Sequence, residues 1–276
     1  MGRFRFGGGV ALVTGGSSGI GAALVRELAR KGMRVIATGR RAELVADIEA
    51  RLNEDVVVKQ KGGRVIGLAG DVTDSEHRDE ISTLIESEGG CLDLLVNNAG
   101  RGYDSELMDG TDESEESLIL LNVMAPLRLT RLLRRPLQAA CEQGGRGTVV
   151  NVSSLVGYVQ MSPIAFYSAT KAALTSLTDS MRHELRSEGI HVIGCHPGMT
   201  ATPFNVASER DSGTPVPKMN QGGRSARAQA RIVVRAIRWR FWTADPIEKW
   251  PMIISAWLFP RTAHRVSARV WPKTHR

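Results

Sequence analysis

Cysteine and long apolar runs are scarce in this chain of 276 residues. The three cysteines, Cys91, Cys141 and Cys195, form neither a CxxC pair nor an even framework, which argues against a disulfide-stapled fold and suits a reducing compartment. We therefore expect a cytoplasmic protein. No run of 18 uninterrupted apolar residues occurs, so no membrane-spanning helix is expected. Glycines interrupt the amino-terminal stretch, and we expect no signal peptide.

Metal-ligand patterns are also lacking. The six histidines are scattered, and the stretch HELRSEGIH does not satisfy HExxH, so no metal site is expected. Hydrophobic residues make up 42% of the chain and charged residues 24%, as in ordinary globular proteins. At this length we expect a single domain.

Positive charge is concentrated at one end of the chain. The net charge is +7, yet residues 224–276 hold twelve Lys or Arg against two acids, which leaves residues 1–223 at −3. All five tryptophans also lie in residues 224–276. We therefore predict a core of residues 1–223, followed by a basic, tryptophan-rich carboxyl-terminal segment of residues 224–276.

Short apolar runs alternate with stretches long enough for helices. Continuous apolar runs are typical of strands covered on both faces, and their alternation with helices indicates βαβ units. The sequence thus predicts an α/β protein with a doubly wound parallel sheet and helices on both faces. The predicted strands are residues 10–15, 34–39, 64–70, 92–98, 148–154 and 191–197.

A glycine-rich turn, TGGSSGIG at residues 14–21, follows the first predicted strand. Its glycines allow a tight bend, so that a pyrophosphate can approach the unpaired N–H groups of the next helix. On the first strand of a βαβ pattern, this turn indicates a dinucleotide site. The expected contacts are Gly15, Ser17, Ser18, Gly19, Ile20 and Gly21.

The ends of the second and third predicted strands indicate which dinucleotide is bound. NAD sites usually offer a carboxylate to the ribose 2′-hydroxyl there, whereas a 2′-phosphate is matched by arginine. Here Arg40 and Arg41 follow the second strand, which favours NADP; the alternative is a solvated arginine pair that opens a helix. Asp71 and Val72, after the third strand, would lie at the adenine edge.

Tyr167 and Lys171, in the stretch YSATK, are four residues apart. In a helix such residues lie on one face. An ammonium beside a phenol favours the phenolate, which lowers the tyrosine pKa from about 10 towards neutrality. Tyr167 would then be a usable proton donor; the alternative is a surface helix that carries an unrelated tyrosine and lysine.

Five motifs occur in order: TGGSSGIG, NNAG, VNVSS, YSATK and HPGMTAT. Together they resemble the short-chain dehydrogenase/reductase family over about residues 8–203. The resemblance implies a Rossmann fold and hydride transfer between a nicotinamide and a carbonyl or alcohol carbon. It implies Tyr167 as the catalytic acid/base and Lys171 as the cation that lowers its pKa and holds the nicotinamide ribose. It further implies Ser154 as the hydroxyl that binds the carbonyl, and Asn122 as the fourth member of the group.

The resemblance also implies cofactor contacts outside the glycine turn and an assembly of subunits. Helices around Asn122 and Tyr167 pair between subunits in relatives, so a homo-dimer or tetramer is expected. Many relatives end in a short strand and a glycine-rich tail, and we recognise no such ending in this sequence. The implied additional contacts are Asn98, Ala99, Gly100, Pro197, Gly198, Thr200 and Thr202.

Neighbours of the implied catalytic residues are assigned by simple geometry. Pro126 lacks the N–H that the carbonyl of Asn122 would meet in a helix, so this carbonyl could hold a water that links Lys171 to solvent; a plain kink is the alternative. Ser153 should point away from Ser154, because adjacent strand residues face opposite sides. We interpret Cys195 and His196 as packing residues.

The predicted function is that of an NADP-dependent carbonyl reductase or alcohol dehydrogenase. One alternative is a serine hydrolase, because residues 15–19 also satisfy G-x-S-x-G with Ser17 as the nucleophile. That elbow requires an oxyanion donor from a loop after an earlier strand, and Ser17 follows the first one. The other alternative is a non-catalytic sensor of NADP.

The substrate wall is predicted to include Tyr158, Met161 and Phe204, beside Ser154 and Tyr167. Its apolar rim favours a lipophilic ketone or alcohol, such as a long-chain 3-oxo lipid or a steroid-like molecule, and thus a role in lipid metabolism.

Residues 224–276 allow two interpretations. Val233 and Ile237 could dock a helix on the sheet, with the arginines solvated and the apolar residues beyond closing the cleft. Alternatively, the basic, tryptophan-containing stretch could make a peripheral membrane contact. No nucleic-acid partner is expected, because no recognised binding motif is present. The arginine stripe comprises Arg227, Arg231, Arg235 and Arg238.

Overall fold

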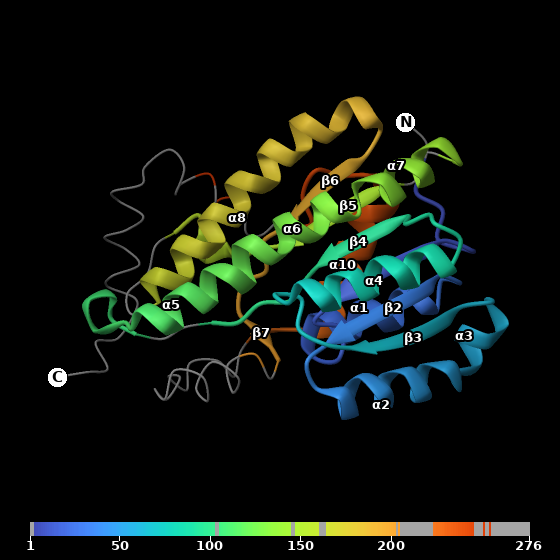
Figure 1. The fold of residues 1–276 in the computed structure, drawn as a ribbon, viewed down its shortest axis with the longest axis horizontal. Helices are drawn as coiled ribbons and strands as arrows, with labels where there is room; N and C mark the ends of the chain where they lie inside the picture. The colour runs from blue at the N-terminus through green and yellow to red at the C-terminus, as the bar shows by residue number, and fades with distance from the viewer. Residues whose placement is uncertain are drawn as a thin grey trace.

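A six-stranded parallel sheet lies at the centre of the protein, in the order β3-β2-β1-β4-β5-β6 (Figure 1). The computed structural model describes residues 3–102, 105–144, 147–159, 164–202, 204, 223–245, 251 and 254. Each of the six strands of this sheet lies within the apolar run that predicted it. The strand order reverses between β1 and β4, and such a switch point opens a ligand crevice at the carboxyl ends of the strands. The strands are β1 Val10–Thr14, β2 Arg34–Gly39, β3 Arg64–Ala69, β4 Leu94–Asn97, β5 Thr148–Val152 and β6 His191–Cys195.

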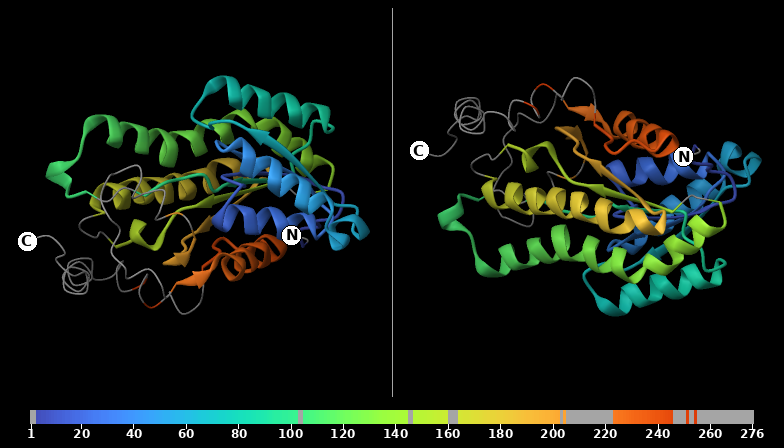
Figure 2. Two further views of the ribbon diagram at one scale, coloured as in Figure 1. Left: turned by 90° about the horizontal axis from the view of Figure 1, so that it is seen from below. Right: turned by 90° about the horizontal axis from the view of Figure 1, so that it is seen from above.

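Helices cover both faces of the sheet (Figure 2). Ala11 and Val13 of β1 point into one hydrophobic cluster, and Val10 and Leu12 into the other, because successive strand side chains alternate. The fold is therefore the predicted Rossmann-like, doubly wound α/β sheet in a single domain. On the first face lie α1 (Gly19–Ala29), α2 (Ala42–Asn53) and α10 (Ala226–Trp239). On the second face lie α4 (Ser75–Ser87), α6 (Ala125–Leu132) and α8 (Ala165–Glu184).

The helix that carries Asn122 changes its winding before Pro126. Helix α5 (Asp112–Ile119) passes through one π-helical stretch, η2 (Leu120–Met124), into α6. The backbone N–H of Ala125 donates to the carbonyl of Leu120, five residues earlier. A π turn is common at functional sites because it widens the helix locally. This π-helical stretch ends two residues before Pro126, and both the kink at Pro126 and the water relay stay predictions.

Short elements connect the main ones. Among them, β7 and β8 form a parallel pair that joins Thr200 to Arg224 and so connects the segment after β6 to the start of α10. The short elements are α3 (Val56–Gln60), α7 (Arg134–Glu142), β7 (Thr200–Ala201), β8 (Arg224–Ser225), and the 3-10 turns η1 (Leu107–Asp109), η3 (Leu155–Gly157) and η4 (Leu185–Glu188).

Helix α10 is docked by its apolar face, as one of the two interpretations of the tail predicts. Val233 and Ile237 are fully buried and share the hydrophobic cluster of α1. The four arginines of the predicted stripe are exposed. The compositional boundary at residue 223 therefore does not separate residues 224–245 from the core in space. Trp250, Trp257 and Trp271 lie outside the described residues.

Beyond α10, the chain meets the edge of β6 in one isolated bridge and forms no strand there within the described residues. Thr243 forms a parallel bridge with Gly194. The N–H of Gly194 donates to the carbonyl of Trp242, and the N–H of Ala244 donates to the carbonyl of Gly194. A single bridge involves too few residues to produce an apolar run in the sequence. Within the described part of the chain, no helix combines the length and apolarity needed to cross a bilayer.

Candidate active site

The glycine turn after β1 forms a cradle that only glycine can build. Gly15 and Gly19 adopt positive φ angles of 62° and 54°, a conformation that other residues rarely accept. A Cβ on Gly21 would lie 2.1 Å from the carbonyl oxygen of Gly15. The turn leads directly into α1, with Ser18 at its N-cap, so free N–H groups face the space above β1.

The NNAG segment after β4 is fastened to this cradle. The side-chain amide of Asn98 donates to the carbonyls of Thr14 and Gly15. In return, the hydroxyl of Thr14 accepts from the N–H groups of Asn98 and Ala99. These bonds hold the carboxyl ends of β1 and β4 together at the switch point. Asn98 thus has a positioning role that the sequence did not reveal.

Arg41 lies beside the same turn. Its guanidinium donates to the hydroxyl of Ser18 at 3.0 Å, and Arg41 is also the N-cap residue of α2. Arg40 is exposed next to it. Two cations therefore stand at the end of β2, where the sequence predicts contact with a 2′-phosphate. Asp71 closes a turn after β3 by accepting from the N–H and hydroxyl of Thr73, and Val72 is buried.

Lys171 is a buried cation beneath Tyr167. Its side chain is 3% exposed, and Nζ donates to the carbonyl of Val152 at 3.1 Å. Burial lowers the pKa of the ammonium to about 8, because desolvation disfavours the charged form. Nζ lies 5.8 Å from the ring centroid of Tyr167, so the predicted i, i+4 pair shares one face of α8.

Asn122 and Gly100 complete this cluster. The amide nitrogen of Asn122 donates to the carbonyl of Arg101 and to the hydroxyl of Thr170, while its amide oxygen accepts from the N–H of Arg101. A Cβ on Gly100 would lie 3.0 Å from that oxygen and 3.2 Å from Nζ of Lys171. A side chain at position 100 would therefore press on the ends of both Asn122 and Lys171.

Ser154 and Ser153 face opposite sides, as predicted. The hydroxyl of Ser153 is buried and donates to the carbonyl of Lys171 at 2.8 Å. Ser154 is half-buried and its Oγ lies 3.5 Å from the carbonyl oxygen of Pro197. It caps the short turn η3, accepting from the N–H of Val156 at 3.4 Å. These weak contacts leave its hydroxyl able to turn towards another acceptor.

The segment after β6 closes over the cradle. A Cβ on Gly19 would lie 3.3 Å from Cβ of Thr202, so this segment meets the glycine turn. The hydroxyl of Thr200 donates to the carbonyl of Gly198, and the ring of Phe204 lies 6.0 Å from that of Tyr167. Phe204 therefore lies beside the tyrosine, as predicted, whereas Met161 lies outside the described residues.

The sequence profile described as short chain dehydrogenase matches residues 9–213. The chain belongs to the short-chain dehydrogenase/reductase family. A farnesol dehydrogenase of Aedes aegypti is 34% identical over 204 residues, which are 72% of this chain and 80% of that protein. The matched residues include all five motifs on which the resemblance was based.

Two solved structures share the fold of this protein. A short-chain dehydrogenase from Sphingobium yanoikuyae, in complex with NADPH, has a TM-score of 0.76 at 23% identity and covers 97% of this chain and 98% of its own. A short-chain dehydrogenase/reductase from Burkholderia phymatum, in complex with NAD, has a TM-score of 0.80 at 22% identity, covering 95% and 97%. The two relatives were thus solved with different dinucleotides.

A hydrogen-bonded chain in the protein joins Tyr158, His196 and Asp245. The hydroxyl of Tyr158 lies 3.2 Å from Nε2 of His196, and Nδ1 of His196 lies 3.0 Å from Oδ2 of Asp245. The N–H of His196 also donates to Asp245, at 2.7 Å. Burial raises the pKa of Tyr158 to about 12. Burial also opposes ionisation of Asp245, but its hydrogen bonds with His196 and Thr243 hold the pKa of the carboxyl below its usual value.

This hydrogen-bonded chain gives His196 and Tyr158 roles beyond packing and lining the substrate wall. His196 is buried, as expected of a packing residue, but it also anchors the strand end that leads into Pro197. Tyr158, predicted as a substrate wall, has its hydroxyl engaged by His196. The available signal was Asp245, one of two acids in a strongly basic segment. Cys195 is fully buried, as predicted.

The sequence did not point to the buried amides of Asn97 and Asn151. Asn97 of β4 donates to Asn151 of β5 at 2.8 Å, and Asn151 donates to the hydroxyl of Thr178 at 3.0 Å. These bonds join two central strands to α8, which carries Tyr167. Among the described residues, no group of His, Cys, Asp and Glu could hold a metal ion, and Ser17 makes no hydrogen bond to a histidine.

Proposed function

We propose that this dehydrogenase is an NADP(H)-dependent carbonyl reductase or alcohol dehydrogenase. The observation that carries the proposal is the convergence of Lys171, Asn122 and Gly100 beneath Tyr167, next to the glycine cradle of β1. A hydride donor in the cradle and a proton donor above Lys171 are the two requirements of carbonyl reduction.

The cofactor site proposed for this chain follows the carboxyl edge of the sheet. The cradle suits a pyrophosphate, because residues larger than glycine would block the turn. Arg40 and Arg41 would face a 2′-phosphate, which supports NADP over NAD. Asp71 and Val72 would lie at the adenine. The remaining proposed contacts are Ser17, Ser18, Ile20, Asn98, Ala99, Gly100, Tyr167, Lys171, Pro197, Gly198, Thr200 and Thr202.

When bound, the nicotinamide supplies or accepts a hydride at a carbonyl carbon. Tyr167 would hold the proton that passes to the resulting alkoxide oxygen, and Ser154 would donate a hydrogen bond to the same oxygen. Lys171 would stabilise the phenolate that remains. With its pKa lowered to about 8, the lysine still carries its charge at neutral pH, and Asn122 would hold the local backbone in place.

The substrate proposed is a lipophilic ketone or secondary alcohol. The ring of Phe204 lies 6.0 Å from that of Tyr167, and Tyr158 follows Ser154 by four residues. The similarity to a farnesol dehydrogenase supports an apolar substrate. A long-chain 3-oxo lipid or a steroid-like molecule would suit this wall, and a role in lipid metabolism would follow. Turnover of small polar ketones without turnover of long-chain ones would reject this substrate class.

The test of the reaction is a panel of carbonyl compounds read out by NADPH absorbance. We expect reduction of at least one apolar ketone, and loss of turnover in Tyr167→Phe by at least about a hundredfold with NADPH binding unchanged. If the chain were a sensor of NADP, Tyr167→Phe would leave every measured property intact. If it were a serine hydrolase, a fluorophosphonate would label Ser17.

Three further predictions are retained as proposals. The chain acts in the cytoplasm, it assembles as a homo-dimer or tetramer through the helices that carry Asn122 and Tyr167, and residues 224–276 contribute a lid or a peripheral membrane contact. Light scattering of the purified protein would measure the assembly. Truncation after residue 223 would remove α10, so the lid is better tested by substitution.

A further inference from the structure

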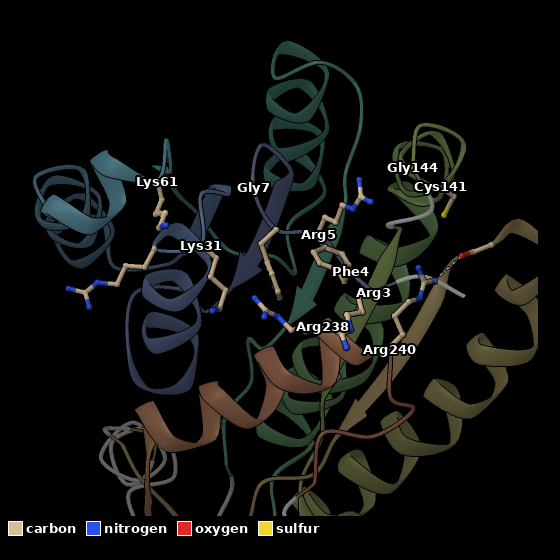
Figure 3. Close-up of a pocket in the computed structure, with 13 residues that line it drawn as sticks. Arg3, Phe4, Arg5, Gly7, Lys31, Lys61, Cys141, Gly144, Arg238 and Arg240 are labelled. Carbon is tan, nitrogen blue, oxygen red and sulfur yellow. Dashed lines mark hydrogen bonds between the residues drawn. The ribbon is translucent and has the colours of Figure 1, made fainter.

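A broad depression of about 1120 Å³ lies at the edge of the sheet opposite the candidate active site (Figure 3). Its walls come from residues that precede strands or end helices. The segment before β1 contributes residues 3–7, the end of α1 contributes Arg30 and Lys31, and the end of α10 contributes Arg238 and Arg240. The glycine turn follows β1, so the two sites lie at opposite ends of the strands.

The depression is strongly basic. None of the thirteen described residues that line it is Asp or Glu. Asp55 neutralises Arg30 in an ion pair of 2.6 Å. Four helices, α1, α3, α7 and α10, end here, and each helix end contributes about half a negative charge. Asp55 and these helix ends together offset about three positive charges, fewer than the six cations other than Arg240. The negative ends of the helices therefore do not neutralise all of the cations in the depression. The seven cations are Arg3, Arg5, Arg30, Lys31, Lys61, Arg238 and Arg240.

Aromatic rings hold several of these cations in place. The guanidinium of Arg3 stacks 3.8 Å from the ring centroid of Trp239. Lys31 and Arg238 each lie 5.6 Å from the ring centroid of Phe6, which is buried in the floor. Such contacts restrain side chains that would otherwise move apart. Like charges repel one another. Cations that are held close together therefore favour the binding of an anion among them.

One exposed ring, that of Trp239, stacks on Arg3 of the depression, and two more exposed aromatic residues follow Arg240 in the chain. Trp239, Phe241 and Trp242 are 44%, 47% and 68% exposed, and they flank Arg240 in the chain. The carbonyl of Arg238 accepts from the N–H of Phe4, which fastens the amino-terminal segment to this end of α10. Basic side chains next to exposed tryptophan are typical of surfaces that lie at a lipid headgroup layer.

We propose that this depression binds the phosphate groups of an anionic phospholipid surface and docks this edge of the molecule on a membrane. The cations bind headgroup phosphates, and Trp239, Phe241 and Trp242 enter the interface. A free polyphosphate would use the cations without the exposed rings, which favours the lipid. Docking at this edge leaves the carboxyl ends of the strands facing away from the membrane, so it does not depend on the proposed reaction.

Flotation of the full chain with vesicles tests the proposal. Vesicles of phosphatidylcholine and phosphatidylglycerol in equal parts should bind the protein, and vesicles of phosphatidylcholine alone should bind it weakly. The double variant Arg5→Ser/Arg238→Ser should lose about 30-fold in partition coefficient, at about fivefold per cation. A matched control, Arg131→Ser/Arg227→Ser, removes two exposed arginines that do not line the depression and should lose less than about threefold.

Several outcomes would overturn the proposal. Equal losses in the two double variants would show a general charge effect rather than a site. Absence of binding by the wild-type chain to the anionic vesicles would also refute it. Binding of inositol hexakisphosphate or of a DNA duplex, without vesicle binding, would assign the cations to another anion. Unchanged melting temperatures and NADPH binding in both variants exclude misfolding as the cause of any loss.

Discussion

The Lys171→Met variant should be more stable than wild type at neutral pH and less stable than wild type at alkaline pH. Lys171 is 3% exposed, and burial lowers its pKa from 10.5 to about 8. The folded chain therefore releases this proton at a lower pH than the unfolded chain. Stability rises with pH wherever the unfolded state binds more protons, so wild-type stability should rise between about pH 8 and pH 10.5.

The magnitude follows from the size of the pKa change. At 1.36 kcal/mol per pKa unit, keeping the lysine charged in the fold costs about 3 kcal/mol below pH 8. Lys171→Met removes that cost but also removes the hydrogen bond to the carbonyl of Val152, a loss of about 2 kcal/mol. The cofactor-free variant should therefore be about 1 kcal/mol more stable than wild type at pH 7 and about 1 kcal/mol less stable at pH 9.5.

Urea unfolding of the cofactor-free protein at several pH values measures this crossover. Lys61→Met is the matched control, because Lys61 is exposed and its replacement removes no buried ammonium from the fold. Lys171→Met should also lose at least about a hundredfold in turnover. A stability difference that stays constant between pH 7 and pH 9.5 would refute the assigned cost of burial.

Three further outcomes are expected. Gly21→Ala would place a methyl group 2.1 Å from a backbone carbonyl oxygen of the turn, so NADPH binding, followed by fluorescence titration, should be lost. Arg41→Glu should lower the preference for NADPH over NADH by at least about tenfold in the ratio of Kd values, a change of about 1.4 kcal/mol. Asp245→Ala removes the buried partner of His196 and should lower the free energy of unfolding by about 3 kcal/mol. Its control, Asp47→Ala, removes one partner of an exposed ion pair and should change that free energy by less than about 0.5 kcal/mol.

Features that depend on short spacing were predictable from the sequence. Each strand was marked by a continuous apolar run, because a strand covered on both faces needs one. The turn at Gly15 and Gly21 was marked by its glycines, because a tight strand-to-helix turn leaves no room for a Cβ. The helical spacing placed Tyr167 and Lys171 on one face, and the resemblance to the family marked them as a catalytic pair.

Features that join distant parts of the chain appeared only in the tertiary structure. The contact between Tyr158 and Asp245 through His196 requires the chain after α10 to return along β6. A single bridge has no periodicity, so no local pattern announces it.

By itself, then, the sequence determined the order of strands and helices, the glycine cradle and the pairing of Tyr167 with Lys171, because each depends on residues a few positions apart. Only the tertiary structure decided that Gly100 meets Asn122 and Lys171, and that cations from both ends of the chain surround one depression. The physical reason is that these contacts depend on how the sheet brings together segments more than a hundred residues apart along the chain, or on the packing of side chains from separate helices and loops.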